Sequence, residues 1–310
     1  MIPLKLFINH SGLAHNTGDH HPENIKRLQS LMDLFEQEPF KSLPQQNTEA
    51  ADIEYIARAH PKDYIFSLQD MIPEQGSCYA DGGDTVLSPG SFDAALDAAG
   101  AACMAVDQVM SGDIKHAFCA TRPPGHHAEP AQAMGFCLFN NAVIAALHAQ
   151  SAHNISRAAI IDFDVHHGNG SDTMARKHDG LFYASSHQFP FYPNTGDPKD
   201  NIDGRICNVA LAAGEGSAEF RRAYIDTILP ALDDFAPEIL IISAGFDAHI
   251  DDPLAEIYLD EDDFKWITEE LVSCAERHCD GKIISILEGG YNLEALKSSV
   301  AVHLQVLATT

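Results

Sequence analysis

Residues 157–170 of the chain read RAAIIDFDVHHGNG, an apolar run that passes directly into a cluster of acidic and imidazole side chains. Successive side chains of an extended segment point to opposite sides, so Asp162, Asp164 and His166 share one side while the residues between them face the other layer. One strand end can therefore supply two metal ligands, Asp164 and His166, together with a supporting carboxylate. Mixed imidazole and carboxylate ligands suit zinc or ferrous iron, and a catalytic zinc usually keeps three protein ligands and an exchangeable water.

Similar apolar runs alternate with helical patterns along the rest of the chain. Strand, helix, strand in series indicates a parallel sheet that is covered on both faces. The predicted strands are 1–7, 115–120, 157–162, 181–185, 206–211, 238–243 and 282–287, and the predicted helices lie near 91–111, 139–152, 217–233 and 260–278. The first of these helices is expected to be capped by Ser91 and stopped by Gly112. Residues 71–90, rich in Gly, Pro and Asp, are expected to form a surface loop, and residues 1–310 a single catalytic domain.

The net charge and the cysteines indicate which kinds of binding partner and which cellular location to expect. The 45 acidic and 19 basic side chains give a formal charge of -26, which opposes binding to nucleic acid or to an anionic membrane surface. A cationic substrate would be attracted, although an acidic surface kept for solubility is the plainer explanation of the charge. Seven scattered cysteines without a C-x-x-C pair fit a reducing cytoplasm, and no stretch reaches the roughly 18 apolar residues of a membrane span. The sequence therefore predicts a soluble, cytoplasmic protein.

Three more of the predicted strands end in polar clusters. The ligand crevice of an open α/β sheet lies beyond the carboxyl ends of its strands, so these clusters are expected to meet around one point. Asp247 is the predicted third metal ligand. Any one cluster alone could be a set of loop caps and polar core residues, and the recurrence at four strand ends favours a metal site. The clusters are Thr121–His127, Asp162–Gly170, Ala244–Asp247 and Glu288–Asn292.

Read as whole strings, these clusters resemble the histone deacetylase and acetylpolyamine amidohydrolase superfamily, in its class II branch. The strings are RPPGHH at 122–127, GFCLFNN at 135–141, DFDVHHGNG at 162–170, SAGFD at 243–247 and EGGYN at 288–292, preceded by HPE at 21–23 and Arg27. The resemblance implies a three-layer, arginase/deacetylase-like α/β domain with a central, mostly parallel sheet of about eight strands. It also implies metal-dependent hydrolysis of the amide bond of an acylated amine. The implied ligands of the metal, zinc or alternatively ferrous iron, are Asp164, His166 and Asp247.

The resemblance also implies catalytic roles for other polar residues. His127 would act as general base and acid, His126 would be held near Asp162, and Tyr291 would donate its hydroxyl to the substrate carbonyl. Asn169 stands where some relatives carry an aspartate beside the second histidine, and a neutral amide stabilises an imidazolium less than a carboxylate does. We therefore expect Asn169 to keep His127 neutral and able to accept a proton.

Members of this superfamily thread the acyl-amine chain between two aromatic side chains. Here these are expected to be Phe136 and one aromatic from the segment 189–192, with Tyr192 preferred to Phe191 and Phe189. Because this segment departs from the commoner pair of phenylalanines, the tunnel is expected to be more polar or differently shaped. Gly135 would offer its backbone carbonyl to the substrate amide.

Two positions near the expected pocket bear on the substrate. Leu254 stands where a polyamine-selective relative carries an acidic gatekeeper, and a leucine cannot pair with a second ammonium. An acyl-lysine peptide or small acylated amine is therefore the preferred substrate, with acetylpolyamine as the alternative that the acidic charge favours. Asp84 resembles a rim position that contacts the substrate backbone, or it is simply a turn residue. A module that binds acyl-lysine without cleaving it is a third hypothesis, against which the intact His127 and Tyr291 count.

Further ions are expected as well. By the resemblance, Asp162 and Ser185 would bind a structural potassium ion behind the catalytic metal, and two aspartates in a buried strand end need cations to offset their repulsion. Arg27 could supply compensating charge, or it could lie on a helix surface. The histidines of the N-terminal loop are expected near the pocket mouth rather than in a second metal site; they are His10, His15, His20 and His21.

Overall fold

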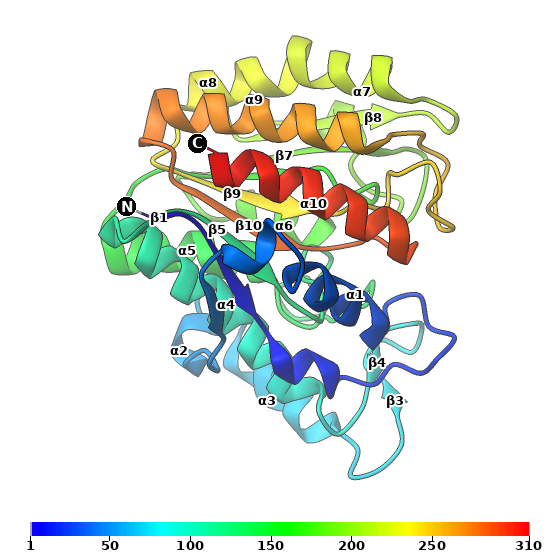
Figure 1. Cartoon of the computed structure of the whole chain (residues 1–310). Coiled ribbons are helices and arrows are strands. Elements are labelled where there is room, and N and C mark those ends of the chain that lie inside the picture. The colour runs from blue at the N-terminus through cyan, green and yellow to red at the C-terminus, as the bar shows by residue number, and fades with distance from the viewer. Residues whose placement is uncertain (1, 310) are drawn as a thin grey trace.

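Eight parallel strands form the centre of the structure (Figure 1), which is a computed structural model that describes residues 2–309. The strands lie in the order β2-β1-β5-β10-β9-β6-β7-β8, and every neighbouring pair is parallel. Their bounds are β1 Ile2–Ile8, β2 Gln45–Asn47, β5 Ile114–Ala120, β6 Ala158–Asp162, β7 Leu181–Gln188, β8 Ile206–Leu211, β9 Ile239–Ala244 and β10 Ile283–Leu287. A small antiparallel ribbon of β3 (Cys78–Tyr79) and β4 (Val86–Leu87) lies outside this sheet.

Helices cover both faces of the sheet, so that the molecule has three layers (Figure 1). One layer contains α1 (Ile25–Phe35), α7 (Ser217–Ala223), α8 (Leu229–Phe235), α9 (Glu261–Cys279) and α10 (Leu293–Thr309). The other contains α2 (Ile53–Ile56), α3 (Lys62–Met71), α4 (Ser91–Ser111), α5 (Asn141–His153) and α6 (Asn169–Ala175). In β6, Ala159 and Ile161 pack in the first core while Ala158 and Ile160 pack in the second. The predicted three-layer α/β fold is confirmed.

The structure differs from the sequence-based expectations mainly in short elements. The helical segment expected near 217–233 is divided into α7, a π-helical turn at Tyr224–Ile228 and α8. Three 3₁₀ turns lie at His10–Leu13, Phe40–Ser42 and Pro198–Asp200. The apolar pattern did not predict β2, because this strand consists of three polar residues at the edge of the sheet. The ribbon of β3 and β4 lies within the stretch expected to be a loop.

The predicted C-terminal end of α4 is confirmed, whereas the predicted N-cap is one residue off. Gly112 ends the helix in the left-handed conformation at φ +80°, which favours glycine. Ser91 is the first helical residue rather than the cap, a position that falls to Gly90. The Ser91 hydroxyl oxygen instead accepts a hydrogen bond from the backbone N–H of Ser88, at 2.7 Å.

The four strands that precede the polar clusters are contiguous in the centre of the sheet. Their order, β5-β10-β9-β6, brings four strand ends together at one edge. The register places Asp162 opposite Ser243 on β9 and opposite Ser185 on β7. The strand interiors are buried throughout, as expected of parallel strands covered on both faces. The strand-end prediction therefore holds for all four clusters.

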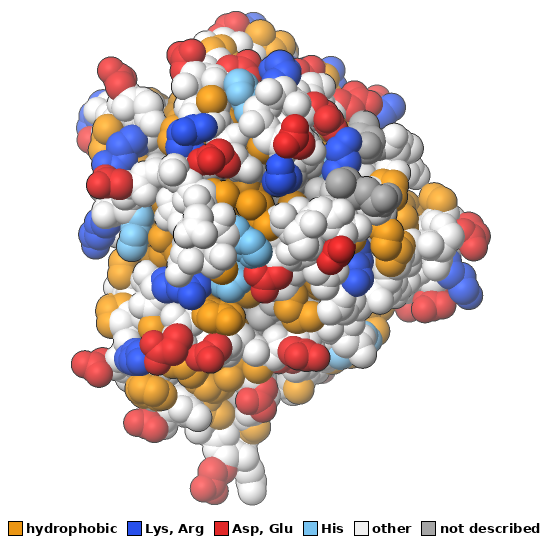
Figure 2. Space-filling view, turned by 90° about the vertical axis from the view of Figure 1, so that its left-hand side faces the viewer, with side chains coloured by type: hydrophobic (Ala, Val, Ile, Leu, Met, Phe, Trp, Pro, Cys, Tyr) orange, Lys and Arg blue, Asp and Glu red, His pale blue; other side chains and the backbone are white. Residues whose placement is uncertain are grey.

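The charged side chains can be compared on one face of the molecule. On the face shown in Figure 2, Asp and Glu side chains are spread over the molecule with Lys and Arg between them. All seven cysteines are free thiols. Between residues 2 and 309, no helix combines the length and the apolar character that crossing a membrane requires.

Candidate metal centre and active site

Three side chains converge beyond the ends of β6 and β9. The Nδ1 atom of His166 lies 3.1 Å from Oδ1 of Asp164 and 3.1 Å from Oδ2 of Asp247, and all three residues are buried. The carboxylate oxygens of Asp164 and Asp247 lie within 4.8 Å of each other. Two buried carboxylates this close repel each other unless positive charge lies beside them. With the imidazole they form a set of donors that suits zinc or ferrous iron. The structure thus brings together the three predicted ligands.

Two glycines make room for the carboxylates. A Cβ atom on Gly245 would overlap Oδ2 of Asp164, and one on Gly289 would overlap Oδ2 of Asp247. The backbone N–H of Gly289 donates to Oδ2 of Asp164 at 2.8 Å, and that of Val165 donates to Oδ1 of Asp247 at 2.9 Å. The glycines in SAGFD and EGGYN therefore permit a close approach of backbone and ligand, and the amides hold both carboxylates in position.

Charges within this set depend on one another. Burial, with a further contribution from Asp164, raises the pKa of Asp247 to about 7. Burial alone would lower the pKa of His166, but its hydrogen bonds to Asp164 and Asp247 raise that pKa to about 10. The three side chains therefore attract positive charge to the point they share, whether the charge is carried by a proton or by a metal ion.

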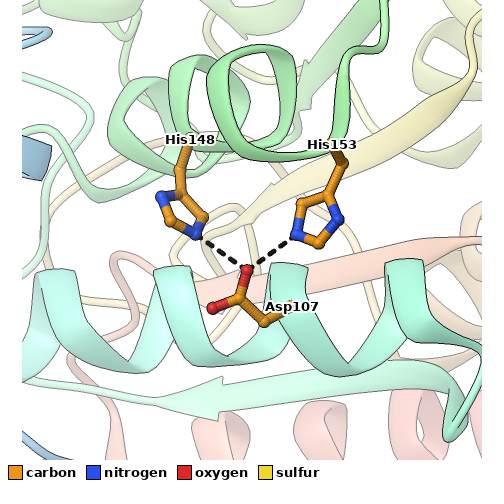
Figure 3. A group of neighbouring side chains, drawn as sticks. All are labelled: Asp107, His148 and His153. Carbon is orange, nitrogen blue, oxygen red and sulfur yellow. Dashed lines mark hydrogen bonds and ion pairs between the residues drawn. The ribbon is translucent and has the colours of Figure 1, made fainter.

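A second group of potential ligands lies between α4 and α5 (Figure 3). Oδ1 of Asp107 is 2.9 Å from Nε2 of His148 and 2.7 Å from Nε2 of His153. The Arg58 guanidinium donates to Nδ1 of His148 at 2.8 Å, so that Nδ1 accepts and Nε2 carries the proton of the neutral ring. A metal-binding histidine donates through its other nitrogen rather than accepting there. Arg58 therefore opposes metal binding at this group.

A third group, formed by Asp233, Cys274 and His278, is also engaged by an arginine. Arg277 donates to both carboxylate oxygens of Asp233, at 2.7 and 3.0 Å. Burial raises the pKa of the Cys274 thiol to about 12, so the thiol stays protonated. Residues 2–309 form three such groups, and an arginine donates hydrogen bonds to a member of two of them. The group at Asp164 is the one without such an arginine contact.

Two adjacent histidines lie beside the three ligands. The rings of His126 and His127 are 4.0 Å apart, and Nδ1 of His126 lies 3.0 Å from Oδ2 of Asp162, as predicted. Burial alone would lower the pKa of His126, but Asp164 and Asp162 raise it well above the usual value. Burial, reinforced by His126 and His166, lowers the pKa of His127 well below the usual value. The pKa values of the two neighbouring imidazoles are thus shifted in opposite directions, that of His126 upward and that of His127 downward.

A cavity of about 360 Å³ is lined by His127, His166 and the predicted substrate-binding residues. Among the aromatic candidates, Tyr192 and Phe191 line the cavity while Phe189 lies outside it. Tyr192 meets the ring of His127 edge-on at 5.2 Å, and Phe191 stacks on His166 at 5.4 Å. The full lining is His21, Pro22, Asp84, His127, Gly135, Phe136, His166, Phe191, Tyr192, Leu254 and Tyr291.

The rim of this cavity includes one histidine of the N-terminal loop. His21 lies edge-on to the Phe136 ring at 4.7 Å, and its Nε2 atom is 3.0 Å from the backbone oxygen of Asp84. His15 is instead buried away from the lining, where its Nε2 lies 3.6 Å from Glu23. Asp84 and Leu254 both line the cavity, and their contact with substrate stays a prediction.

Sequence reasoning did not foresee a buried ion-pair network behind the site. Glu23 forms ion pairs with Arg122 and, at 3.2 Å, with Arg27, and all three side chains are buried. Arg27 is thus not a helix-surface residue. Its guanidinium donates to the backbone oxygens of Glu288 and Gly290, at 2.5 and 2.6 Å. The signal was present, because these residues occur within or beside the strings that carry the resemblance.

Glu288 begins one of these strings, but the sequence did not predict a role for it. Its Oε2 atom accepts from the backbone N–H groups of Gly125 and His126, at 2.6 and 3.1 Å. The first residue of the EGGYN string, directly after β10, therefore holds the loop that carries both histidines. Only the neighbouring positions of β5 and β10 in the sheet make this contact available.

The two residues predicted to bind potassium are register partners on β6 and β7. Oδ2 of Asp162 accepts a hydrogen bond from the Tyr183 hydroxyl at 3.0 Å, and the Ser185 hydroxyl lies 2.9 Å from Nδ1 of His187. The structure thus places Asp162 and Ser185 side by side, with polar neighbours around both. The ion itself stays a prediction.

The sheet and the site together define a class of protein. A parallel α/β fold carries, at the carboxyl ends of its central strands, a buried set of two carboxylates and one imidazole beside a further histidine whose pKa is lowered by burial. A metal ion and a general base in this relation are the parts that hydrolysis by activated water requires. The sheet and the site therefore fit the class of hydrolases that use a metal ion at the edge of a parallel sheet.

The chain belongs to the histone deacetylase family. The family model described as "Histone deacetylase domain" matches residues 21–307. "Histone deacetylase 14, chloroplastic" of Arabidopsis thaliana is 36% identical over 317 residues, which cover 96% of this chain and 75% of the relative. "Histone deacetylase-like amidohydrolase" of Pseudomonas aeruginosa is 36% identical over 279 residues, 87% of this chain and 72% of the relative. The resemblance inferred from the sequence strings is confirmed.

The fold comparison agrees with the family. The "Crystal Structure of HDA15 HD domain" superposes with a TM-score of 0.91 and 30% sequence identity, covering 98% of this chain and 88% of that chain. Because the likeness extends over nearly all of both chains, it includes the sheet and the loops that hold the site. The chain is thus a hydrolytic enzyme of the deacetylase class.

Proposed function

We propose that the protein removes acyl groups from amine nitrogen atoms with zinc bound by Asp164, His166 and Asp247. The observation that carries the proposal is the convergence of these three buried donors next to His127, which lines the same cavity as His166. The names of the relatives, which include deacetylases and an amidohydrolase, support the same type of reaction.

The side chains divide the chemistry between them. A zinc ion in this set supplies the Lewis acidity that activates water and polarises the acyl carbonyl. His127, whose pKa is lowered by burial, can accept a proton from the attacking water and return that proton to the leaving amine. The Tyr291 hydroxyl donates a hydrogen bond to the carbonyl oxygen as negative charge develops there. His126, held by Asp162 and with its pKa raised, would contribute positive charge beside the reacting groups.

The cavity lining supports an acyl-lysine-type substrate. Phe136 and Tyr192 provide aromatic walls that suit the apolar stem of a lysine side chain, and Phe191 adds a third. Gly135 lines the same cavity, where its backbone carbonyl would accept the N–H of the scissile amide. Asp84 on the rim would accept from the backbone of a peptide that carries the acylated lysine.

Leu254 separates the two substrate candidates. It lines the cavity. By the family resemblance it stands where an acidic side chain would pair with a second ammonium group. We therefore expect an acetyl-lysine peptide to be hydrolysed faster than acetylspermidine, and Leu254→Glu to shift the ratio of kcat/KM values toward acetylspermidine. A wild-type preference for acetylspermidine would reverse this assignment.

Acetate release distinguishes catalysis from binding alone. An enzyme releases acetate from the peptide and stops when a chelator removes the metal, whereas a non-catalytic acyl-lysine binding module holds the peptide intact. Ferrous iron suits the same three donors, and a comparison of the acetate release by zinc-loaded and iron-loaded protein decides between the metals.

We also propose that Asp162 and Ser185 bind a structural potassium ion, which a potassium-dependent rise in Tm would test.

A further inference from the structure

Asn169 links His127 to a carboxylate to which no catalytic role has been assigned. The Nδ2 atom of Asn169 lies 2.6 Å from Oε1 of Glu129, and Oδ1 of Asn169 lies 2.8 Å from Nδ1 of His127. The Thr173 hydroxyl donates to the same Glu129 oxygen at 3.2 Å. Glu129 is half-buried and lies outside the lining of the substrate cavity.

These contacts determine which way the amide of Asn169 faces. A carboxylate only accepts hydrogen bonds, so the NH₂ group of Asn169 must face Glu129 and its oxygen must face His127. The other two neighbours of Nδ2, the Met134 sulfur at 3.3 Å and the His127 backbone oxygen at 3.4 Å, also accept. Both lie farther away than Glu129, whose charge makes it the strongest acceptor of the three.

The orientation of the amide in turn determines where His127 carries its proton. An amide oxygen cannot donate, so Nδ1 of His127 must hold the hydrogen that lies between it and Asn169. A neutral imidazole has only one N–H, and the lone pair is therefore on Nε2. This is the form of the ring that can accept a proton through Nε2.

We propose that Glu129 is a positioning residue that holds the hydrogen of the His127 ring on Nδ1 by orienting the amide of Asn169. This inference rests on the proposed function, in which His127 is the base. Without the carboxylate, the amide of Asn169 can turn over and donate its N–H to Nδ1. The proton of the ring then moves to Nε2, and the ring can no longer accept one there.

Three variants test the proposal by ¹⁵N NMR of histidine-labelled, zinc-loaded protein and by kinetics on an acetyl-lysine peptide. Glu129→Ala should convert His127 into a mixture of tautomers and lower kcat by about tenfold, with KM changed by less than about twofold. Glu129→Gln keeps an acceptor oxygen and should retain the wild-type tautomer and kcat within about threefold. Thr173→Val removes the other side-chain hydrogen bond of Glu129 and should behave as the wild type.

Two results would overturn the proposal. One is a Glu129→Ala protein in which His127 remains entirely in the Nδ1–H form and kcat is unchanged. The other is a Glu129→Gln protein that is as impaired as Glu129→Ala, because charge rather than amide orientation would then be responsible. Wild-type protein that releases no acetate would refute the proposed function instead, while the NMR measurement would still decide the role of Glu129.

Discussion

The guanidinium of Arg27 lies over the ring of Tyr291, 5.2 Å from the ring centroid. The same guanidinium donates to the backbone oxygens of Glu288 and Gly290, so one buried side chain holds both the aromatic ring and the segment that carries it. Arg27 comes from α1, far from Tyr291 in the sequence. The position of the tyrosine hydroxyl therefore depends on a residue that lies outside the cavity lining.

Replacement of Arg27 should consequently impair catalysis through Tyr291. Arg27→Lys keeps the charge but loses the forked hydrogen bonds of the guanidinium, so we expect kcat on an acetyl-lysine peptide to fall by about tenfold. In a Tyr291→Phe background the same change should have little further effect, since the hydroxyl that it positions is absent. Equal losses in both backgrounds would show that Arg27 does not act through Tyr291.

Removal of the Tyr291 hydroxyl should reduce turnover without disturbing the fold. One well-placed donor to a developing oxyanion is worth about 10²- to 10³-fold in kcat, and Tyr291→Phe is expected to lose that amount with a small change in KM. Steady-state kinetics and a thermal unfolding curve measure the two quantities. A kcat within a factor of about three of the wild type would exclude the hydroxyl from the reaction.

Metal binding should depend on Asp247 and not on the group at His153. We expect zinc at about one ion per chain, loss of acetate release with a chelator, and recovery when zinc is restored. Asp247→Ala should lose the bound zinc. The matched control His153→Ala should keep it, because Arg58 opposes binding at the second group. Metal analysis of the purified variants gives the result, and a zinc content lowered by His153→Ala would contradict the assignment.

The Glu23 network should make stability depend on acid pH. Burial alone would raise the pKa of Glu23, but Arg122 and Arg27 lower it from 4.5 to about 2. The folded pKa is below the unfolded one, so the stabilisation is fully present above pH 4.5 and is lost as the pH falls toward 2. Glu23→Gln should cost about 3 to 5 kcal/mol at neutral pH because it leaves buried arginines unpaired.

Denaturant unfolding at several pH values tests this prediction. The difference in stability between the wild type and Glu23→Gln should narrow as the pH falls below 4.5. Glu54→Gln is a control, because Glu54 forms an exposed ion pair with Lys62 that is worth at most about 1 kcal/mol. A gap between wild type and Glu23→Gln that stays constant from pH 7 to about 3 would mean that the carboxylate charge is not responsible.

Exchange of the amide at position 169 for a carboxylate should shift the pH profile. In an Asn169→Asp protein the introduced carboxylate would stabilise the imidazolium of His127 and raise its pKa, so the acidic limb of kcat/KM should move to higher pH. The new carboxylate would also face Glu129, which lies 2.6 Å from Nδ2 of Asn169. The double variant with Glu129→Gln removes that repulsion, and an unmoved profile in both variants would refute the role of Asn169.

Much of the site could be predicted because its signals are local. The alternation of side chains along an extended segment places Asp164 and His166 on one side of the strand end, and no tertiary contact is needed to infer it. The same reasoning applied to the other strand ends identified Asp247. Which of Phe189, Phe191 and Tyr192 reaches the cavity could not be read from the sequence, because the path of that loop depends on what it packs against.

The sequence by itself determined the parallel α/β class, three candidate ligands and a family resemblance, since apolar periodicity and residue strings are properties of short segments. Only the tertiary structure decided that β5, β10, β9 and β6 are neighbours, and therefore that Glu288 holds the histidine loop and Arg27 lies over Tyr291. The tertiary structure likewise brought Glu129 to Asn169 and Arg58 to His148. Such contacts join residues distant in sequence, and they arise from the packing of whole layers rather than from any local preference.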